Sequence, residues 1–438
     1  MESSRFLTRT LMCRDHEAMR FRYNVAARAV GRLEVIDRDY VPFGCVDRDG
    51  SVNRNSVRRW ISSRAVPMTR PAAASLASSL GLSSTEELML SGLGLSLSDQ
   101  YWLRPDGFAG RWADVSLFGR DFSTEVGQAL LPHDESSAAQ ARVRVRNDMA
   151  ILSSSPDTAL NGNLPKRWEM IDGEPYLVKS GKREHLMLEP YCESAATRVC
   201  ERLLEPGEFV PYALLEPDNS SALSVCPCMV DEFHELVPAV DVIGLTRLGN
   251  SSSLYEKYLD VLERHGLSGA RASLERMLVI DHLISNWDRH WGNFGVIVDS
   301  ETREWVCPAP LFDMGESLWC DRAFSPTLVP YHLKYKMPFL TRPGDQMARY
   351  VRGAAWELAA DASEVIDDVL DELYLSPLAR AASGYLDMVE RGLELRAADI
   401  ASLACLGRRE QFISRDGYLY MPRVPDEGPR VPDEVQER

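Results

Sequence analysis

The sequence predicts a mixed α+β protein with a small β-rich part, a mainly helical part after it, and a separate module in front. Residues 159–181 contain two short strand-like runs, and apolar residues recur with a helical period after about residue 240. The 438 residues are too many for one ordinary domain. We expect an N-terminal accessory module over 1–125, a β-rich lobe over 126–240, a helical lobe over 241–405 and a Pro-rich acidic tail over 406–438.

Composition narrows the class of protein. The net charge is −16, from 49 basic and 65 acidic residues, and such a surface repels nucleic-acid phosphates. No apolar run approaches the roughly 18 residues of a membrane span, and the N-terminus lacks the apolar core of a signal peptide. Nine scattered cysteines suit reduced, mostly buried thiols. We therefore expect a cytoplasmic protein with no membrane partner and no direct nucleic-acid partner.

The N-terminal module shows helical patches over 51–72 and 74–95, interrupted by Pro67 and Pro71. Residues 133–140, HDESSAAQ, are small and polar, and they predict a linker.

The β-rich lobe begins with a hairpin whose turn is Asp172-Gly173. The run from 190 to 203 has apolar residues at a 3.6-residue period and starts with Pro190, so it predicts an amphipathic helix. FVPYALL and ALSVCPCMV, residues 209–215 and 222–230, predict two more strands.

The helical lobe contains an apolar stripe over 274–284 that leads into the sequence ISNWDRHWGNFG. A second hairpin is expected from FGVIV and EWVCPAPLF, and residues 346–405 are expected to be helical. The tail repeats RVPDE twice, and a Pro-rich polar repeat of this kind predicts disorder or an extended arm.

Three oxygen-bearing residues after the apolar stripe indicate phosphoryl transfer. Asp288 and Asn293 share a loop, and the following hairpin delivers Asp313 within LFDMGESLW. A phosphotransferase needs a carboxylate beside the attacking hydroxyl, and an amide oxygen plus a second carboxylate to hold Mg²⁺ against the phosphates. The spacing Asp-x4-Asn followed by Asp-x-Gly is the order found in protein kinases.

An upstream pair completes the set. Lys179 ends a predicted strand and Glu193 lies on the next predicted helix, as a kinase requires for the lysine that contacts the nucleotide phosphates and its glutamate partner. Each residue alone is a weak signal, but the ordered set is hard to obtain by accident.

His290 permits other interpretations. With Asp288 it would form a metal pair or the general base of a hydrolase, yet no His or Cys cluster supports zinc and no Gly-x-Ser-x-Gly nucleophile elbow exists. We expect His290 to order the loop or to touch phosphate or metal. Arg289 is expected to pair with a loop carboxylate or a phosphate, and Trp287 and Trp291 are expected to pack.

The candidate phosphate-covering loop is LNGNLPKRW, which offers one glycine, Gly162, and the charge of Lys166. Just before it, SSSPDT contains Ser153, Ser154 and Ser155. A phosphate on one of them would add about −2 charge beside the nucleotide site; a flexible serine linker is the alternative.

These motifs together resemble the HipA-like family of serine/threonine kinases. The resemblance rests on NGNLPKRW, YLVKSG, EPYCESAATRVCERL, ELVPA, NWDRHWGNFG and APLFDMGESLW, over about residues 150–330. It implies a two-lobed protein-kinase-like fold that uses ATP and Mg²⁺. It also implies that Asp288 is the catalytic base and that Asn293 and Asp313 are the two metal ligands. Lys179 would bind the phosphates with Glu193 as its partner. The adenine hinge would be Val230, Asp231, Glu232 and Phe233.

The resemblance further implies a protein substrate, autophosphorylation at Ser153 to Ser155, and an antitoxin or regulatory partner of a toxin–antitoxin system. SLSDQYW in the N-terminal module points to a distinct branch of the family. Two other functions share this machinery, a regulatory pseudokinase and a small-molecule kinase. No metal or phosphate ligand is missing, which argues against the pseudokinase.

Overall fold

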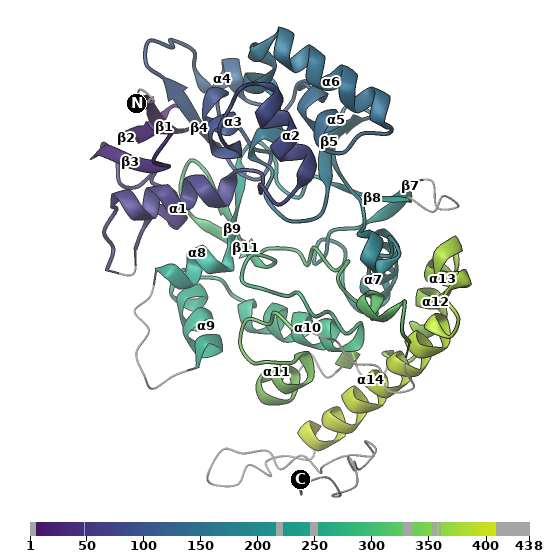
Figure 1. Cartoon of the computed structure of the whole chain (residues 1–438). Coiled ribbons are helices and arrows are strands. Elements are labelled where there is room, and N and C mark those ends of the chain that lie inside the picture. The colour runs from purple at the N-terminus through teal and green to yellow at the C-terminus, as the bar shows by residue number, and fades with distance from the viewer. Residues whose placement is uncertain are drawn as a thin grey trace, which may run out of the picture.

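The computed structural model describes residues 6–47, 49–215, 222–245, 253–326, 335–352, 357–358 and 361–408. Within them the chain forms three antiparallel sheets and a set of helices, so the predicted mixed α+β class is confirmed. In Figure 1 the N-terminal strands and α1 to α6 occupy the upper part, and α9 to α14 the lower part. The C-terminal tail from 409 onward lies outside the described residues.

The first sheet belongs to the N-terminal module and has the strand order β3-β2-β1-β4. Its strands were not foreseen from the sequence, which had indicated only helices there. One face of β2 is buried and the other exposed along HEAMRFRYN, the alternation that a sheet covered on one side requires. The strands are β1 (Phe6–Cys13), β2 (His16–Asn24), β3 (Ala29–Val35) and β4 (Tyr101–Pro105).

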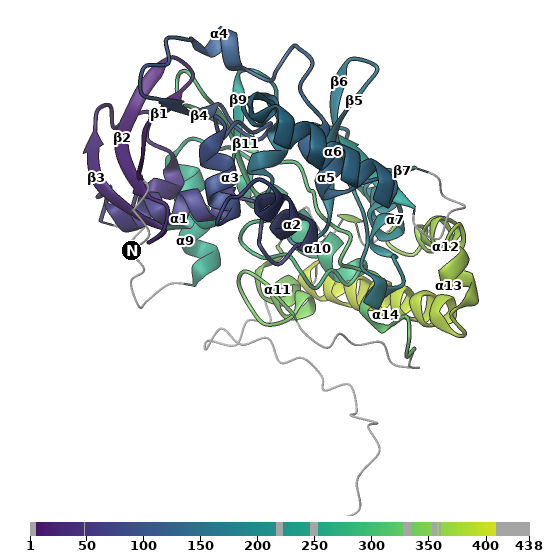
Figure 2. The same ribbon diagram turned by 45° about the horizontal axis from the view of Figure 1, so that its top comes forward.

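Helices α1 to α6 come after β3, with β4 between α3 and α4, and α1 lies beside the sheet (Figure 2). The expected linker at 133–140 is wrong, because α6 starts there. Asp134 and Ser137 form a capping box: the Ser137 N–H donates to Asp134 Oδ1 at 2.8 Å, and the Asp134 N–H donates to Ser137 Oγ at 3.1 Å. The helices are α1 (Arg54–Arg64), α2 (Pro71–Ser79), α3 (Thr85–Ser91), α4 (Trp112–Val115), α5 (Glu125–Leu130) and α6 (Glu135–Asn147).

The apolar core does not divide at residue 125. One cluster of buried side chains joins α2 and α3 to α5 and α6, and another joins the N-terminal sheet to the second sheet through Trp102 and Trp168. The N-terminal module is therefore packed against the β-rich lobe as part of a shared core.

The second sheet has the order β5-β6-β8-β7 and carries the predicted hairpin. Asp172 and Gly173 both have positive φ, 52° and 87°, as a two-residue hairpin turn requires. The predicted helix follows as α7 with Pro190 in its first turn. These elements are β5 (Lys166–Ile171), β6 (Glu174–Lys179), α7 (Glu189–Leu203), β7 (Ala213–Leu215) and β8 (Leu223–Pro227).

The third sheet, β11-β10-β9, connects the two predicted lobes. β9 (His234–Pro238) comes directly after the predicted hinge and pairs with β10 (Gly295–Asp299), which starts after the Asp288 loop. Only glycine fits at 295, because a Cβ there would collide with the carbonyl oxygen of Val237. β11 (Trp305–Pro308) completes the second predicted hairpin.

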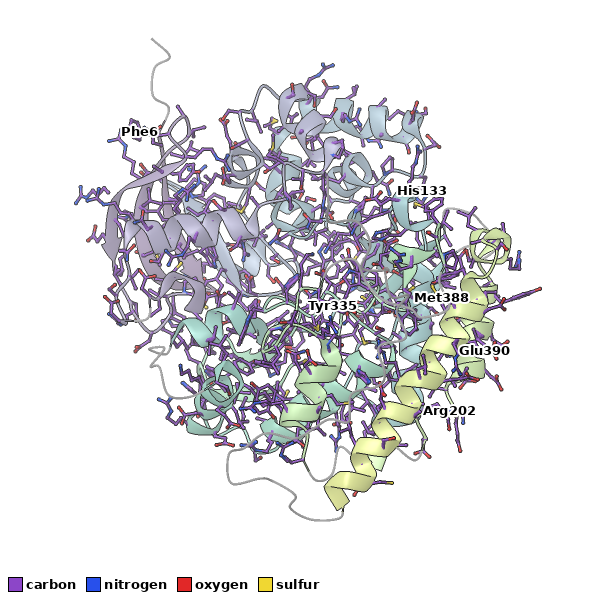
Figure 3. All side chains as sticks on the ribbon, turned by 60° about the horizontal axis from the view of Figure 1, so that its bottom comes forward. Phe6, His133, Arg202, Tyr335, Met388 and Glu390 are labelled. Carbon is purple, nitrogen blue, oxygen red and sulfur yellow. The ribbon has the colours of Figure 1, made fainter. Side chains whose placement is uncertain are left out.

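The remaining helices form the largest core with α7, in the region after about residue 240 where the sequence predicts mainly helix. α12 is fixed to α7 by ion pairs, among them Arg202 Nε to Asp368 Oδ2 at 2.9 Å (Figure 3 labels Arg202). The helices are α8 (Ala239–Gly244), α9 (Leu254–Arg264), α10 (Ala270–Leu283), α11 (Pro343–Tyr350), α12 (Ile366–Tyr374), α13 (Pro377–Ala381) and α14 (Tyr385–Arg408). Short 3-10 helices are η1 (Phe43–Cys45), η2 (Met149–Ser154), η3 (Pro156–Ala159), η4 (Arg183–His185) and η5 (Cys320–Arg322).

All nine cysteines are free thiols and six are buried, as the sequence predicts. None of the helices in the described part of the chain combines the length and apolar character needed to cross a bilayer.

Candidate active site

Lys179 stands at the centre of the site. It is the last residue of β6, it is 3% exposed, and its ammonium group touches three side chains. Nζ lies 2.8 Å from Glu193 Oε1, 2.6 Å from Asp313 Oδ1 and 3.1 Å from the hydroxyl oxygen of Tyr212. The structure thus brings together three of the predicted residues, which come from β6, α7 and the segment after β11.

The Asp313 segment is shaped to meet α7. Asp313 has a φ of +57°, which turns the chain so that the next N–H, that of Met314, donates to Glu193 Oε2 at 2.9 Å. A Cβ on Gly315 would lie 3.0 Å from Glu193 Cγ, so the close approach favours glycine there. Glu193 therefore holds both Lys179 and the Asp-Met-Gly turn.

The charges of this cluster reinforce each other. Burial opposes the charged form of Lys179, but Asp313 and Glu193 outweigh it and raise the pKa of the lysine well above its usual value. Burial likewise opposes the ionisation of Asp313, but Lys179 and Lys166 lower the pKa of that carboxyl below its usual range. At neutral pH the site contains an ammonium ion beside an ionised carboxylate.

Arg289 holds the Asp288 loop against the Asp313 segment. Its side chain is fully buried and pairs with Asp281 of α10 at 2.9 Å, so its carboxylate partner comes from the helix and not from the loop as predicted. The Nη1 of Arg289 donates to the backbone carbonyls of Asn293 at 2.6 Å and Phe312 at 2.7 Å. One guanidinium nitrogen therefore binds the backbone of one predicted metal ligand and of the residue just before the other.

Asn293 and Asp313 suit a magnesium ion chemically. The Asn293 side-chain amide donates from Nδ2 to the Asp288 carbonyl at 3.1 Å, so the nitrogen is used inside the loop. An amide oxygen and an ionised carboxylate are the hard ligands that Mg²⁺ prefers. The fit is one of donor chemistry, supported by the low pKa of Asp313.

His290 orders its loop, which is one of the roles expected for it. Its Nδ1 accepts the Gly292 N–H at 3.0 Å, and its Nε2 lies 3.9 Å from Asp288 Oδ2. The side chain is 45% exposed. Trp287 and Trp291 pack as expected; the Trp291 ring lies 5.7 Å from Tyr258 between ring centroids.

The candidate phosphate-covering loop lies over Lys166. Gly162 has a φ of +104°, and a Cβ there would collide with Lys166 Nζ. Lys166 and Lys179 face each other across the β5–β6 hairpin. Within the described residues no ion pair involves Lys166. Burial lowers the pKa of Lys166 to about 8; Lys179 and Arg70 lower it further, and Asp313 opposes the shift. An ammonium with no fixed partner beside two other cations is suited to an anionic ligand.

Arg70, which no sequence motif indicated as part of the site, reaches the same loop from the N-terminal module. Arg70 precedes α2, is 3% exposed, and donates from Nε to the Gly162 carbonyl at 2.7 Å and from Nη2 to the Asn161 carbonyl at 3.3 Å. No local pattern could have indicated this contact, since it joins residues that are distant in the sequence.

The three loop serines differ in exposure. Ser154 is exposed, Ser153 is half-buried and Ser155 is 1% exposed. Ser155 Oγ accepts the Asp157 N–H at 3.4 Å at the start of η3. Of the three hydroxyl groups, that of Ser154 is the one on the surface.

The predicted hinge, Val230 to Phe233, joins β8 to β9 and is backed by the N-terminal module. Gln100 is fully buried, and its Nε2 donates to the carbonyls of Asp231 and His234, each at 2.9 Å. Arg14 donates to the Glu232 carbonyl at 3.0 Å. The SLSDQYW sequence thus supports the hinge backbone, a role that its composition alone did not reveal.

Comparison with known proteins adds little to this geometry. No protein-family model matches the chain, and no curated protein matches it. Among solved structures, the Helicobacter pylori proinflammatory kinase CtkA is similar with a TM-score of 0.43 and 15% identity, over 56% of this chain and 90% of that one. This likeness is too distant to define the fold or the function.

Proposed function

We propose that the chain is an ATP- and Mg²⁺-dependent protein kinase that transfers the γ-phosphoryl group of ATP to a serine or threonine hydroxyl. The observation that carries the proposal is the contact of Lys179 with both Glu193 and Asp313, at 2.8 and 2.6 Å. A phosphotransferase of the kinase type needs this lysine–glutamate pair beside the metal-binding carboxylate. The Asp288 loop is anchored to the same segment by Arg289.

Each residue then has a defined task. Lys179 binds the nucleotide phosphates and Glu193 fixes its position. Lys166 and the backbone of the Gly162 loop cover the phosphates, and the hinge backbone from Val230 to Phe233 reads adenine. Asn293 and Asp313 would hold Mg²⁺, which neutralises charge on the phosphates when bound.

Asp288 is the base of the reaction. Burial raises the pKa of Asp288, which makes the carboxylate a better proton acceptor, while a hydrogen bond from Lys336 opposes that rise. The acceptor oxygen forms a bond to the γ-phosphorus, the bond from phosphorus to the β,γ-bridging oxygen breaks, and ADP leaves. The acceptor proton passes to Asp288.

The rest of the proposal concerns arrangement, acceptor and compartment. The β-rich and helical parts act as two lobes around ATP, and the acceptor is a protein, with an antitoxin or regulatory partner as one candidate and Ser154 as the candidate for autophosphorylation. Nine free thiols suit a reducing cytoplasmic compartment.

The test is transfer of label from γ-labelled ATP with Mg²⁺ to the protein itself and to a cell lysate. We expect label on serine or threonine, and Asp288→Asn should lower the transfer rate at least about 100-fold while ATP still binds. A melting shift with Mg-ATP but no transfer to any protein would indicate a regulatory pseudokinase. Label on small hydroxylated compounds alone would indicate a small-molecule kinase.

A further inference from the structure

A lysine from a distant part of the chain contacts the predicted base. Lys336 Nζ lies 2.6 Å from Asp288 Oδ1, although 48 residues separate the two in sequence. The Lys336 side chain is 44% exposed and that of Asp288 is 15% exposed. The Lys336 ammonium therefore contacts the Asp288 carboxylate on one side and is open to solvent on the other, where an acceptor and a phosphate can approach.

The position of Lys336 is fixed by its neighbours. Its backbone N–H donates to the Trp287 carbonyl at 2.7 Å, which ties the segment to the residue just before Asp288. Three residues later, Phe339 packs against Trp291 with 5.3 Å between ring centroids. The Phe339 N–H also donates to Gln346 Oε1 of α11 at 2.8 Å. Tyr335, which precedes Lys336, is labelled in Figure 3.

Few other charged groups lie close to Asp288, so Lys336 is its main cationic neighbour among the described residues. Glu316 is the other carboxylate that acts on Asp288, and it is paired with Lys182. His290 lies 3.9 Å away and is half exposed. Lys336 is thus the cation in direct contact with Asp288 among the described residues. A transferring phosphoryl group brings more negative charge to this place, and a fixed donor there stabilises it most in the transition state.

We propose that Lys336 positions Asp288 and donates a second hydrogen bond to the phosphoryl group while it passes from ATP to the acceptor. The inference rests on the proposed kinase function and adds a residue to it. The ammonium stays protonated throughout: the acceptor proton goes to Asp288, and the electron pair of the broken P–O bond leaves with ADP. One of the three N–H donors of Lys336 orients the carboxylate, and another faces the phosphate.

The experiment compares Lys336→Met and Lys336→Arg with the wild-type protein, using the full-length chain. Lys257→Met on α9 is the control for loss of a lysine outside the site. Single-turnover transfer from Mg-ATP, the KM for ATP and the dissociation constant for ATP are measured, and thermal unfolding checks that each variant is folded.

We expect Lys336→Met to lower kcat by about 10²–10³-fold, the usual effect of losing one preorganised donor. ATP affinity should stay within about twofold, and Lys336→Arg should recover much of the lost kcat because it keeps a cation with N–H donors. The inference would be overturned if Lys336→Met lost only ATP affinity, or if Lys336→Met and Lys336→Arg lost kcat equally. It would also be overturned if Lys336→Met transferred phosphate faster than the wild type, because the contact with Asp288 would then be inhibitory. If the wild type itself transfers no label, the proposed function fails instead.

Discussion

Arg70 donates from Nε to the backbone carbonyl of Gly162 at 2.7 Å, so a residue of the N-terminal module holds the loop that lies over Lys166. The guanidinium is nearly fully buried, and burial lowers the pKa of Arg70 to about 10, with Asp157 opposing the shift. A buried cation that binds two loop carbonyls fixes the loop in one position. The module therefore contributes to the proposed nucleotide site.

The first prediction concerns this contact. Arg70→Met should leave the carbonyls of Asn161 and Gly162 without their donor, which costs about 1–3 kcal/mol for buried groups. We expect ATP affinity to fall at least about fivefold in calorimetric titration. Arg54→Met, an exposed arginine at the start of α1, is the matched control and should bind like the wild type. Unchanged ATP binding by Arg70→Met would show that the loop does not need this residue.

A second prediction concerns the buried ion cluster. Lys179→Met removes the cation between Glu193 and Asp313, and leaving the buried carboxylate of Glu193 without its cation costs about 3 kcal/mol or more. Urea unfolding without nucleotide should show the loss. Glu193→Gln keeps an oxygen for Lys179 and should cost less. If both variants unfold at the wild-type urea concentration, the cluster contributes nothing to stability.

The third prediction is a pH dependence of ATP binding. Lys166 has a pKa of about 8 in the free protein, so it is charged below that pH and loses its charge above it. A bound polyphosphate favours the charged form, and therefore ATP affinity should decrease as pH rises from 7 through 9. Lys166→Met should bind ATP more weakly at pH 7 and should lose this part of the pH dependence. An identical slope in both proteins would exclude Lys166 as a phosphate ligand.

The fourth prediction concerns Asp157, a fully buried carboxyl that accepts the Trp168 N–H at 2.9 Å. Burial raises its pKa to about 7, although Trp168 and Arg167 oppose the rise. Between about pH 4 and 7 the folded state keeps a proton that the unfolded state releases, so this group makes stability fall as pH rises.

Asp157→Asn keeps the acceptor without the charge. It should be more stable than the wild type at pH 8, by up to roughly 4 kcal/mol, and nearly equal at pH 4. Thermal unfolding at both pH values measures the difference, with the exposed Asp106→Asn as control. A destabilised Asp157→Asn at pH 8 would mean that the carboxylate is needed as an ion.

Local patterns predicted much of the site. The Asp172-Gly173 turn and the apolar stripes fixed β6 and α7, and these elements place Lys179 beside Glu193. The order of Asp288, Asn293 and Asp313 along the chain indicated one site, and Arg289 ties the backbone of Asn293 to that of Phe312, next to Asp313. These features depend on short stretches of sequence, where period and turn chemistry are informative.

Contacts between distant segments could not be predicted in this way. Arg70, Gln100 and Lys336 reach the site by tertiary packing, and nothing in their immediate sequence indicates a ligand or a partner. The strands β1 to β4 were missed, although the alternation in β2 and the apolar start of β4 both fit strands. At 133–140 the small polar residues concealed a helix start, since the capping box satisfies the backbone that a linker would leave to water.

The shared core of the N-terminal module has a consequence for biosynthesis. Arg70 leaves the ribosome well before Gly162, and Asp288 well before Lys336, so each contact closes only after its later residue has been made. A nascent chain that ends before Lys336 contains the proposed ATP-binding residues and lacks the lysine that contacts Asp288. The role proposed for Lys336 then implies that phosphoryl transfer stays slow until synthesis has passed this residue.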